Sequence, residues 1–178
     1  MSHPPTASDL IARNTTYQPT HHPTATLSER FASGLKGPTV AIIACPDPRC
    51  IPETFLNLTT WDAVVIRTAG SNVTAALPTL IAIDKLVGLQ EIMVVNHTDC
   101  GALMYRDDEI RETLRARAPR MAHVIEQMAF GEITGTLEDR VTEHVAIARR
   151  CELLRQELRE KVTGYIYDLK DGSLKHVN

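Results

Sequence analysis

The sequence has no long uncharged apolar run, no excess of one charge and no apolar leader segment. No stretch reaches the roughly 18 uncharged apolar residues of a transmembrane helix, so we expect no membrane insertion. The formal net charge is −3, which gives no reason to expect nucleic acid or another polyanion as a partner. Residues 1–22 are rich in Pro, Thr, Ser and His and lack the apolar core of a secretory signal. We therefore expect a cytoplasmic protein.

Cysteines are few, with four in 178 residues, which excludes a small fold held by many disulfides. In a cytoplasmic protein they are expected to be metal ligands, reactive thiols or core residues. Apolar residues make up 43% of the chain and charged residues 23%, the proportions of a folded soluble domain. We predict a polar N-terminal arm over residues 1–23 and a single domain over residues 24–178.

Three short apolar runs rich in β-branched residues predict strands at residues 39–44, 63–66 and 91–95. Continuous apolar runs are typical of strands buried on both faces, as in parallel sheets. Between the last two runs, residues 73–89 are nearly all apolar and predict a buried crossover helix that ends at Gly88. This order predicts an α/β fold with a mainly parallel central sheet flanked by helices, preceded by an N-terminal helical arm.

The remaining pattern predicts further helices and a terminal hairpin. Short helices are expected at residues 26–35, 107–117 and 121–130, and apolar residues at helical spacing predict a long helix over residues 138–162. Two strand-like segments flank a turn around Asp171-Gly172, which predicts a hairpin at the end of the chain.

Potential metal ligands follow two of the predicted strands. Cys45 comes directly after the first strand, and His97 and Cys100 follow the third. Ligand sites in open parallel sheets form beyond the carboxyl ends of the strands, so these three side chains are expected to meet. Two thiolates and one imidazole suit Zn²⁺, and three protein ligands leave its fourth position open, as catalytic zinc sites require.

A carboxylate and a guanidinium lie two positions apart in the loop after Cys45. Asp47 and Arg49 are expected to form a charge-assisted pair that fixes the orientation of the carboxylate. Such a carboxylate can orient a water or hydroxide on the zinc. It can also turn toward the metal and become its fourth ligand, which would close the site. The sequence leaves both roles open.

These residues resemble the motifs of the β-class carbonic anhydrases, which are Cys-x-Asp-x-Arg after the first strand and His-x-x-Cys-Gly after the third. The segment at residues 67–72 is similar to the Arg-Asn-Ala-Gly-Asn stretch of the family. The resemblance covers roughly residues 24–178, and the short chain looks most like the compact cab-type branch and fungal members. Aromatic residues make up only 4% of the chain, and the aromatic pocket wall of plant-type members is not visible.

The resemblance implies a zinc lyase that hydrates carbon dioxide reversibly to bicarbonate and a proton. Zinc-bound hydroxide, oriented by Asp47 that Arg49 holds, would attack carbon dioxide. From the residues themselves, we expect Gly70 to meet a backbone requirement close to the substrate, and Gly101 with the amides after Cys100 to donate hydrogen bonds to bound bicarbonate at a helix N-terminus. The family also implies a homodimer or a higher homo-oligomer, in which the N-terminal helix wraps around the partner.

Three alternatives stay open. The same site could hydrolyse carbonyl sulfide or carbon disulfide, which are linear like carbon dioxide. The protein could instead be a catalytically weak, zinc-stabilised member of the family. Finally, Cys50 could join the three predicted ligands in a closed structural zinc site, although we favour Cys50 as a packing residue outside the metal shell.

Overall fold

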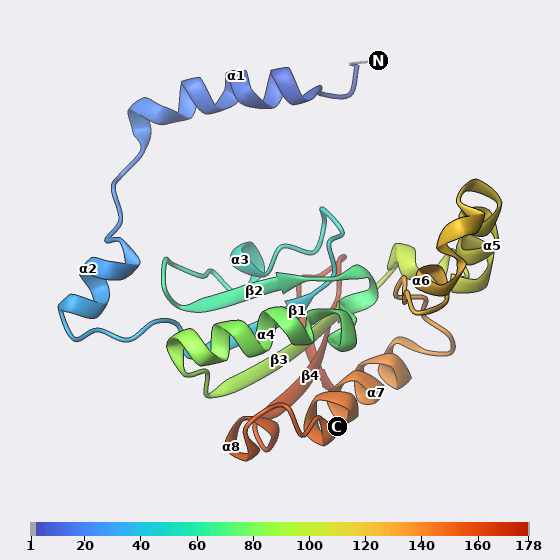
Figure 1. Cartoon of the computed structure of the whole chain (residues 1–178). Coiled ribbons are helices and arrows are strands. Elements are labelled where there is room, and N and C mark those ends of the chain that lie inside the picture. The colour runs from blue at the N-terminus through green and yellow to red at the C-terminus, as the bar shows by residue number, and fades with distance from the viewer. Residues whose placement is uncertain (1–2, 178) are drawn as a thin grey trace. The chain divides into compact units, whose positions relative to one another are not determined.

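The computed structural model describes residues 3–177 (Figure 1). By their contacts these residues divide into two units, of which the first ends at Leu35 and the second begins at Lys36. The boundary predicted after residue 23 thus lies within the first unit. No helix among the described residues is long and apolar enough to cross a membrane.

The first unit contains short helices with side-chain caps. They are α1 (Ala7–Tyr17), the 3-10 turn η1 (Gln18–Thr20) and α2 (Leu27–Ala32). Thr6 and Thr26 precede α1 and α2, and each forms a capping box in which its hydroxyl accepts a hydrogen bond from the third helical amide. The predicted helical arm is therefore present. No residue of α1 is buried, and its Leu10 and Ile11 side chains are exposed.

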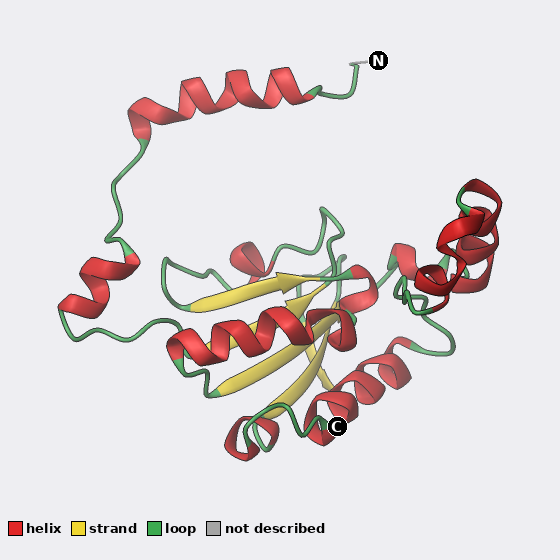
Figure 2. Ribbon diagram, viewed as in Figure 1, coloured by secondary structure: helices red, strands yellow, loops and turns green. Residues whose placement is uncertain are grey.

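The second unit is built on a five-stranded sheet in the order β2-β1-β3-β4-β5. The strands are β1 (Val40–Ala44), β2 (Ala63–Arg67), β3 (Glu91–His97), β4 (Val162–Tyr167) and β5 (Leu174–Val177). The first four run parallel, and β5 pairs with β4 in the antiparallel direction. The predicted mainly parallel sheet and terminal hairpin are confirmed (Figure 2).

Helices connect these strands. They are α3 (Pro52–Phe55), η2 (Ala69–Ser71), α4 (Val73–Val87), η3 (Gly101–Leu103), α5 (Asp107–Arg117), η4 (Pro119–Met121), α6 (Ala122–Glu126), α7 (Leu137–Arg150) and α8 (Gln156–Arg159). Helix α4 is the predicted crossover. The Asn72 side chain caps it by accepting a hydrogen bond from the Ala75 amide, and Gly88 ends it in the left-handed conformation at φ 72°.

Both faces of the sheet are covered, as its apolar strands require. On one face α4 and α7 pack over the strands (Figure 1). The largest buried cluster lies there and includes Ile43, Leu80 and Val145. On the other face a smaller cluster forms around Ile42 and Val95, against which side chains of α3 and β5 pack. Strand β1, which lies between β2 and β3, is therefore buried from both sides.

The prediction of one long helix over residues 138–162 is wrong. Helix α7 ends at Arg150, a turn follows, α8 spans only one turn, and Val162 begins β4. The apolar residues of this stretch have helical spacing, but tertiary contacts of Arg155 interrupt the helix. Its guanidinium donates to the Asp84 carboxylate at 2.8 and 3.0 Å and to the Leu89 carbonyl at 2.6 Å. These bonds tie the turn to the end of α4 and direct the chain back to the sheet.

Candidate metal centre

Three predicted ligands meet at the carboxyl ends of neighbouring strands. Strand β1 pairs with β3 in parallel, with Ala44 opposite Val95, so the next residues along the chain bring Cys45 close to His97. The turn after β3 returns Cys100 to the same place. The ligand atoms of Cys45, His97 and Cys100 all lie within 4.8 Å of one another, and all three residues are buried.

The geometry of this cluster fits a tetrahedral metal ion. The Sγ atoms of Cys45 and Cys100 lie 3.7 Å apart, close to the spacing of about 3.8 Å for two thiolates bound to one zinc at about 2.3 Å. The Nδ1 atom of His97 is 2.9 Å from the Thr98 carbonyl oxygen, to which it donates a hydrogen bond. Its Nε2 atom is then left with a lone pair, and it is buried without a hydrogen-bond partner.

The two thiols influence each other's ionisation. The two sulfurs share a hydrogen bond, which lowers the pKa of Cys45 and raises the pKa of Cys100. The shared bond thus favours the thiolate form at Cys45. A thiolate is the form that binds a metal, so this hydrogen bond favours the first step of metal uptake.

Asp47 and Arg49 form the predicted ion pair on the loop beside the cluster. The Arg49 Nε and Nη2 atoms donate to the two carboxylate oxygens of Asp47 at 3.0 and 2.8 Å, and the Arg49 backbone amide also donates to Asp47, at 2.9 Å. The side-chain hydrogen bonds from Arg49 lower the pKa of Asp47 to about 2. The carboxylate is therefore charged and held in one orientation.

This orientation keeps Asp47 next to the ligand cluster. Its Oδ2 atom lies 3.8 Å from the Nε2 atom of His97. Both carboxylate oxygens accept bonds from Arg49, which is the pairing expected when Asp47 does not join the ligands.

A cavity of about 250 Å³ opens beside the thiol of Cys45. Its walls are mostly small or apolar and consist of Cys45, Pro46, Asp47, Ala69, Gly70, Gly101, Ala102 and Tyr105. The predicted substrate residues Gly70 and Gly101 thus both line it, together with the Asp47 carboxylate. The cavity suits a small apolar molecule that must reach the metal cluster.

Gly70 is needed for the shape of this cavity. Its φ is 61°, and a Cβ atom there would overlap the carbonyl oxygen of Gly131. Gly131 itself has φ 87°, and a Cβ at that position would overlap the backbone of Ala69. The segment around Gly131 therefore packs tightly against the cavity wall, and both positions require glycine.

The other cysteines and histidines lie outside the cluster. Cys50 is buried among Ile42, Ala44 and Val95, and burial raises the pKa of its thiol to about 11. This position agrees with a packing role. Cys151 is half-buried at the end of α7. Among the described residues, the ligand group that could hold a metal ion contains neither of them.

Several residues that shape the site are not indicated by any pattern in the sequence. The Thr98 carbonyl fixes the tautomer of His97, and the Tyr105 ring forms one wall of the cavity. Asp99 contacts Arg49 through its carboxylate and its backbone carbonyl. Its position between two predicted metal ligands was the one feature of the sequence that pointed to a role for Asp99 in the site. The left-handed turn that aims it cannot be seen in the sequence.

A family model described as carbonic anhydrase matches residues 40–174, about three quarters of the chain. The chain belongs to the β-carbonic anhydrase family. The matched region contains the whole metal-ligand cluster, the Asp47–Arg49 pair and the cavity.

Relatives in this family carry two different activities in their names. The β-carbonic anhydrase 1 of Mycobacterium tuberculosis is 38% identical over 93 residues, which are 48% of this chain and 57% of that protein. The match thus spans little more than half of that relative's length. A carbon disulfide hydrolase from an Acidianus species is 26% identical over 157 residues, 77% of this chain and 76% of that protein.

A solved β-carbonic anhydrase fold covers nearly the entire chain. The carbonic anhydrase from Glaciozyma antarctica superposes with a TM-score of 0.80 at 27% identity, over 97% of this chain and 98% of that one. The α/β architecture is therefore that of the family.

Proposed function

We propose that this protein is a zinc enzyme that hydrates carbon dioxide reversibly to bicarbonate and a proton. The observation that carries the proposal is the convergence of Cys45, His97 and Cys100 beside a carboxylate that is held open by Arg49. A site with three ligands and an open position is typical of catalytic zinc, whereas structural zinc sites have four protein ligands.

Zinc held by these three side chains would supply a nucleophile at neutral pH by acidifying a water molecule. The His97 ring is already prepared for this role, because its Nδ1–H is bound to the Thr98 carbonyl and its Nε2 lone pair is free. The two cysteines contribute negative charge that partly neutralises the ion, so the nucleophile forms less readily than in an all-histidine site.

Asp47 orients the attacking group. Its carboxylate is charged throughout the neutral range and cannot donate a hydrogen bond, so it accepts one from the nucleophile and turns the nucleophile's lone pair toward the cavity. Arg49 holds the carboxylate in that direction through two hydrogen bonds. The pair thereby acts on orientation, which lowers the entropic part of the barrier.

Carbon dioxide is expected to bind in the 250 Å³ cavity between the small side chains of Ala69 and Ala102. An apolar linear molecule loses little hydration there, whereas charged bicarbonate is bound less well by the same walls. We assign Gly70 and Gly101 to the substrate site because both line this cavity, where they expose backbone atoms and no side chain to the substrate.

Carbon disulfide or carbonyl sulfide hydrolysis is the second candidate. The Acidianus relative with that name aligns over 77% of this chain, and the cavity walls accept any small linear molecule. The two activities are separated by assaying one zinc-quantified preparation with carbon dioxide, carbonyl sulfide and carbon disulfide. A higher kcat/KM for carbon dioxide supports the first proposal, and a higher value for either sulfur compound supports the second.

We further propose that the protein is cytoplasmic and acts as a homodimer or a higher homo-oligomer. Helix α1 has 11 residues, none of them buried, and helices this short are marginal in water without a partner surface. The exposed Leu10, Ile11 and Tyr17 side chains would be covered by a second copy. Light scattering on the full chain tests the assembly, and a monomer at micromolar concentration would refute it.

A further inference from the structure

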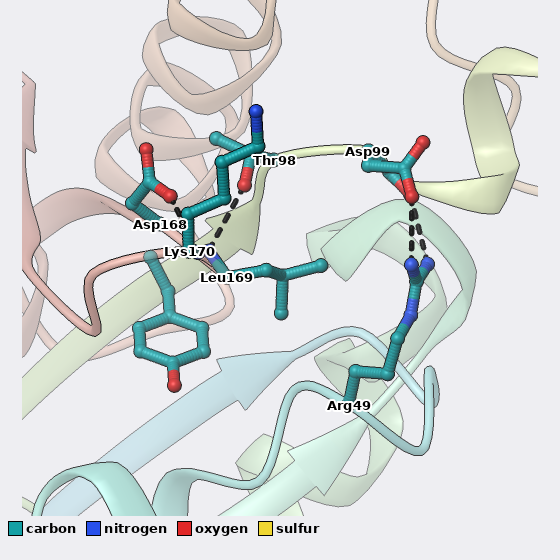
Figure 3. Close-up of a pocket in the computed structure, with 7 residues that line it drawn as sticks. Arg49, Thr98, Asp99, Asp168, Leu169 and Lys170 are labelled. Atoms are coloured by element: carbon teal, nitrogen blue, oxygen red, sulfur yellow. Dashed lines mark hydrogen bonds and ion pairs between the residues drawn. The ribbon is translucent and has the colours of Figure 1, made fainter.

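The guanidinium of Arg49 is held between two aspartates. On one side it binds both carboxylate oxygens of Asp47. On the other side its Nη1 atom donates to the Asp99 carboxylate at 2.7 Å, and its Nη2 atom donates to the Asp99 backbone carbonyl at 2.9 Å (Figure 3). Arg49 therefore cannot turn away from Asp47 without also breaking its contacts with Asp99.

The backbone at Asp99 is unusual for a residue with a side chain. Its φ is 53°, in the left-handed region that glycine enters without cost. This turn lets the chain bring Cys100 back beside His97. The Asp99 side chain is 78% exposed, so burial does not explain why an aspartate stands there. Among the described residues, the partner of its carboxylate is Arg49.

The turn that carries Asp99 is anchored to the end of β4. The Thr98 amide donates to the Tyr167 carbonyl at 3.0 Å, and the Thr98 hydroxyl accepts from the Leu169 amide at 3.0 Å. The bonded residues line one side of a larger open cavity, which Arg49 and Asp99 also line (Figure 3). Asp99 is thus a fixed support for Arg49, although it lies at the surface.

We infer that Asp99 is a positioning residue, which holds the Arg49 guanidinium so that the Asp47 carboxylate stays directed at the metal-ligand cluster. Its effect on the rate rests on the proposed function, whereas its effect on Arg49 rests on the contacts alone. When the Asp99 carboxylate is removed, Arg49 keeps the bond to the backbone carbonyl but turns more freely. Asp47 is then held less firmly, and the reaction slows.

Substitution by glycine separates the side chain of Asp99 from its backbone. Asp99→Gly keeps the left-handed turn and removes only the carboxylate. Asn57→Gly is the matched control, because Asn57 is also exposed, has φ 50° and lines neither cavity beside Arg49 or Cys45. Both variants should keep one zinc per chain and an unfolding temperature within about 3 °C of the wild type.

The rate of carbon dioxide hydration should then distinguish the two variants. We expect kcat/KM of Asp99→Gly to fall about tenfold, the loss of one charge-assisted contact, while Asn57→Gly keeps the wild-type rate. Asp99→Asn should restore part of the rate, because its amide oxygen still accepts from Arg49 without the charge. If the glycine variant fails to fold or to retain zinc, the Asp99→Asn variant takes its place in the test.

A second readout is independent of activity. In zinc-loaded protein labelled with ¹⁵N-arginine, the Nε–H signal of Arg49 is identified by its loss in Arg49→Lys. Its exchange with solvent should be at least about fivefold faster in Asp99→Gly than in the wild type, since one side of the guanidinium is released. Unchanged exchange overturns the inference even if the wild type proves inactive toward carbon dioxide. Faster exchange with an unchanged rate in an active enzyme also overturns it.

Discussion

The Sγ atoms of Cys45 and Cys100 lie 3.7 Å apart although 55 positions separate the residues in the chain. Parallel pairing of β1 with β3 brings the two loops together, and the turn at Asp99 completes the approach. Since a ring nitrogen of His97 lies within 4.8 Å of both sulfurs, the fold itself assembles a three-ligand site.

Cys100→Ser should abolish stable zinc binding. Serine is a poor ligand for zinc at neutral pH, and two remaining protein ligands form a weak site. Zinc content after dialysis against a chelator should fall from one per chain to near zero, and carbon dioxide hydration should be lost with it. Cys151→Ser is the matched control at a half-buried cysteine outside the cluster and should keep its zinc. Full zinc retention in Cys100→Ser would disprove the ligand assignment.

Cys50→Ser should retain one zinc per chain but unfold more easily. Cys50 is fully buried among apolar side chains of β1 and β3, where a hydroxyl finds a poor environment. The expected loss in the free energy of unfolding is about 1–3 kcal/mol, measured by urea denaturation. If Cys50→Ser instead lost zinc as Cys45→Ser does, the metal site would be a closed Cys₃His site without a catalytic position.

Asp47→Asn should keep zinc and lose activity. The amide has nearly the same volume, but it is uncharged and cannot pair with Arg49 through two carboxylate oxygens. We expect kcat to fall by roughly 10²-fold, the usual size of a lost positioned partner in proton and hydrogen-bond catalysis. Asp62→Asn, at an exposed aspartate in the loop before β2, serves as the control. An unchanged rate would make the Asp47–Arg49 pair a structural ion pair only.

The unfolding free energy should depend on pH through His144. This histidine is buried on α7, its Nδ1 atom accepts a hydrogen bond from the amide of Val73 at the start of α4, and burial lowers its pKa to about 4. The unfolded chain binds the proton near pH 6.5. The contribution of neutral His144 to stability is therefore complete above pH 6.5 and is lost as the pH falls toward 4, by about 3 kcal/mol in total.

The test compares denaturant unfolding of two variants at pH 7 and pH 4. His144→Asn keeps an acceptor for the Val73 amide but does not titrate, so its loss of stability over this range should be about 3 kcal/mol smaller than that of the wild type. His123→Asn, at an exposed histidine, should follow the wild type. Equal losses in all three proteins would show that protonation of His144 does not destabilise the fold.

The main elements of the fold could be predicted because local and tertiary preferences agree there. The strand at Val40–Ala44 is apolar on both sides and is buried on both sides. Helix α4 begins at a capping asparagine and ends at a left-handed glycine, as its sequence indicates. At residues 138–162 the preferences conflict, and the bonds of Arg155 to α4 decide the outcome against a continuous helix.

The ligands and the ion pair could be predicted because motif spacing and sheet topology determine them. Contacts made by side chains far apart in the sequence could not. The second partner of Arg49 depends on the left-handed turn at Asp99. The cavity wall depends on how the segment at Gly131 packs against Gly70. Such contacts depend on the tertiary arrangement of loops, and loops have no periodic sequence pattern from which these contacts could be predicted.

The most direct test of the central claim is a zinc titration of the metal-free protein, followed by stopped-flow measurement of carbon dioxide hydration. The three-ligand site predicts that the hydration rate rises in proportion to added zinc and stops rising at one equivalent per chain. The Cys100→Ser protein should show no rise over the same range. A hydration rate at the uncatalysed level with one zinc bound per chain would contradict the account.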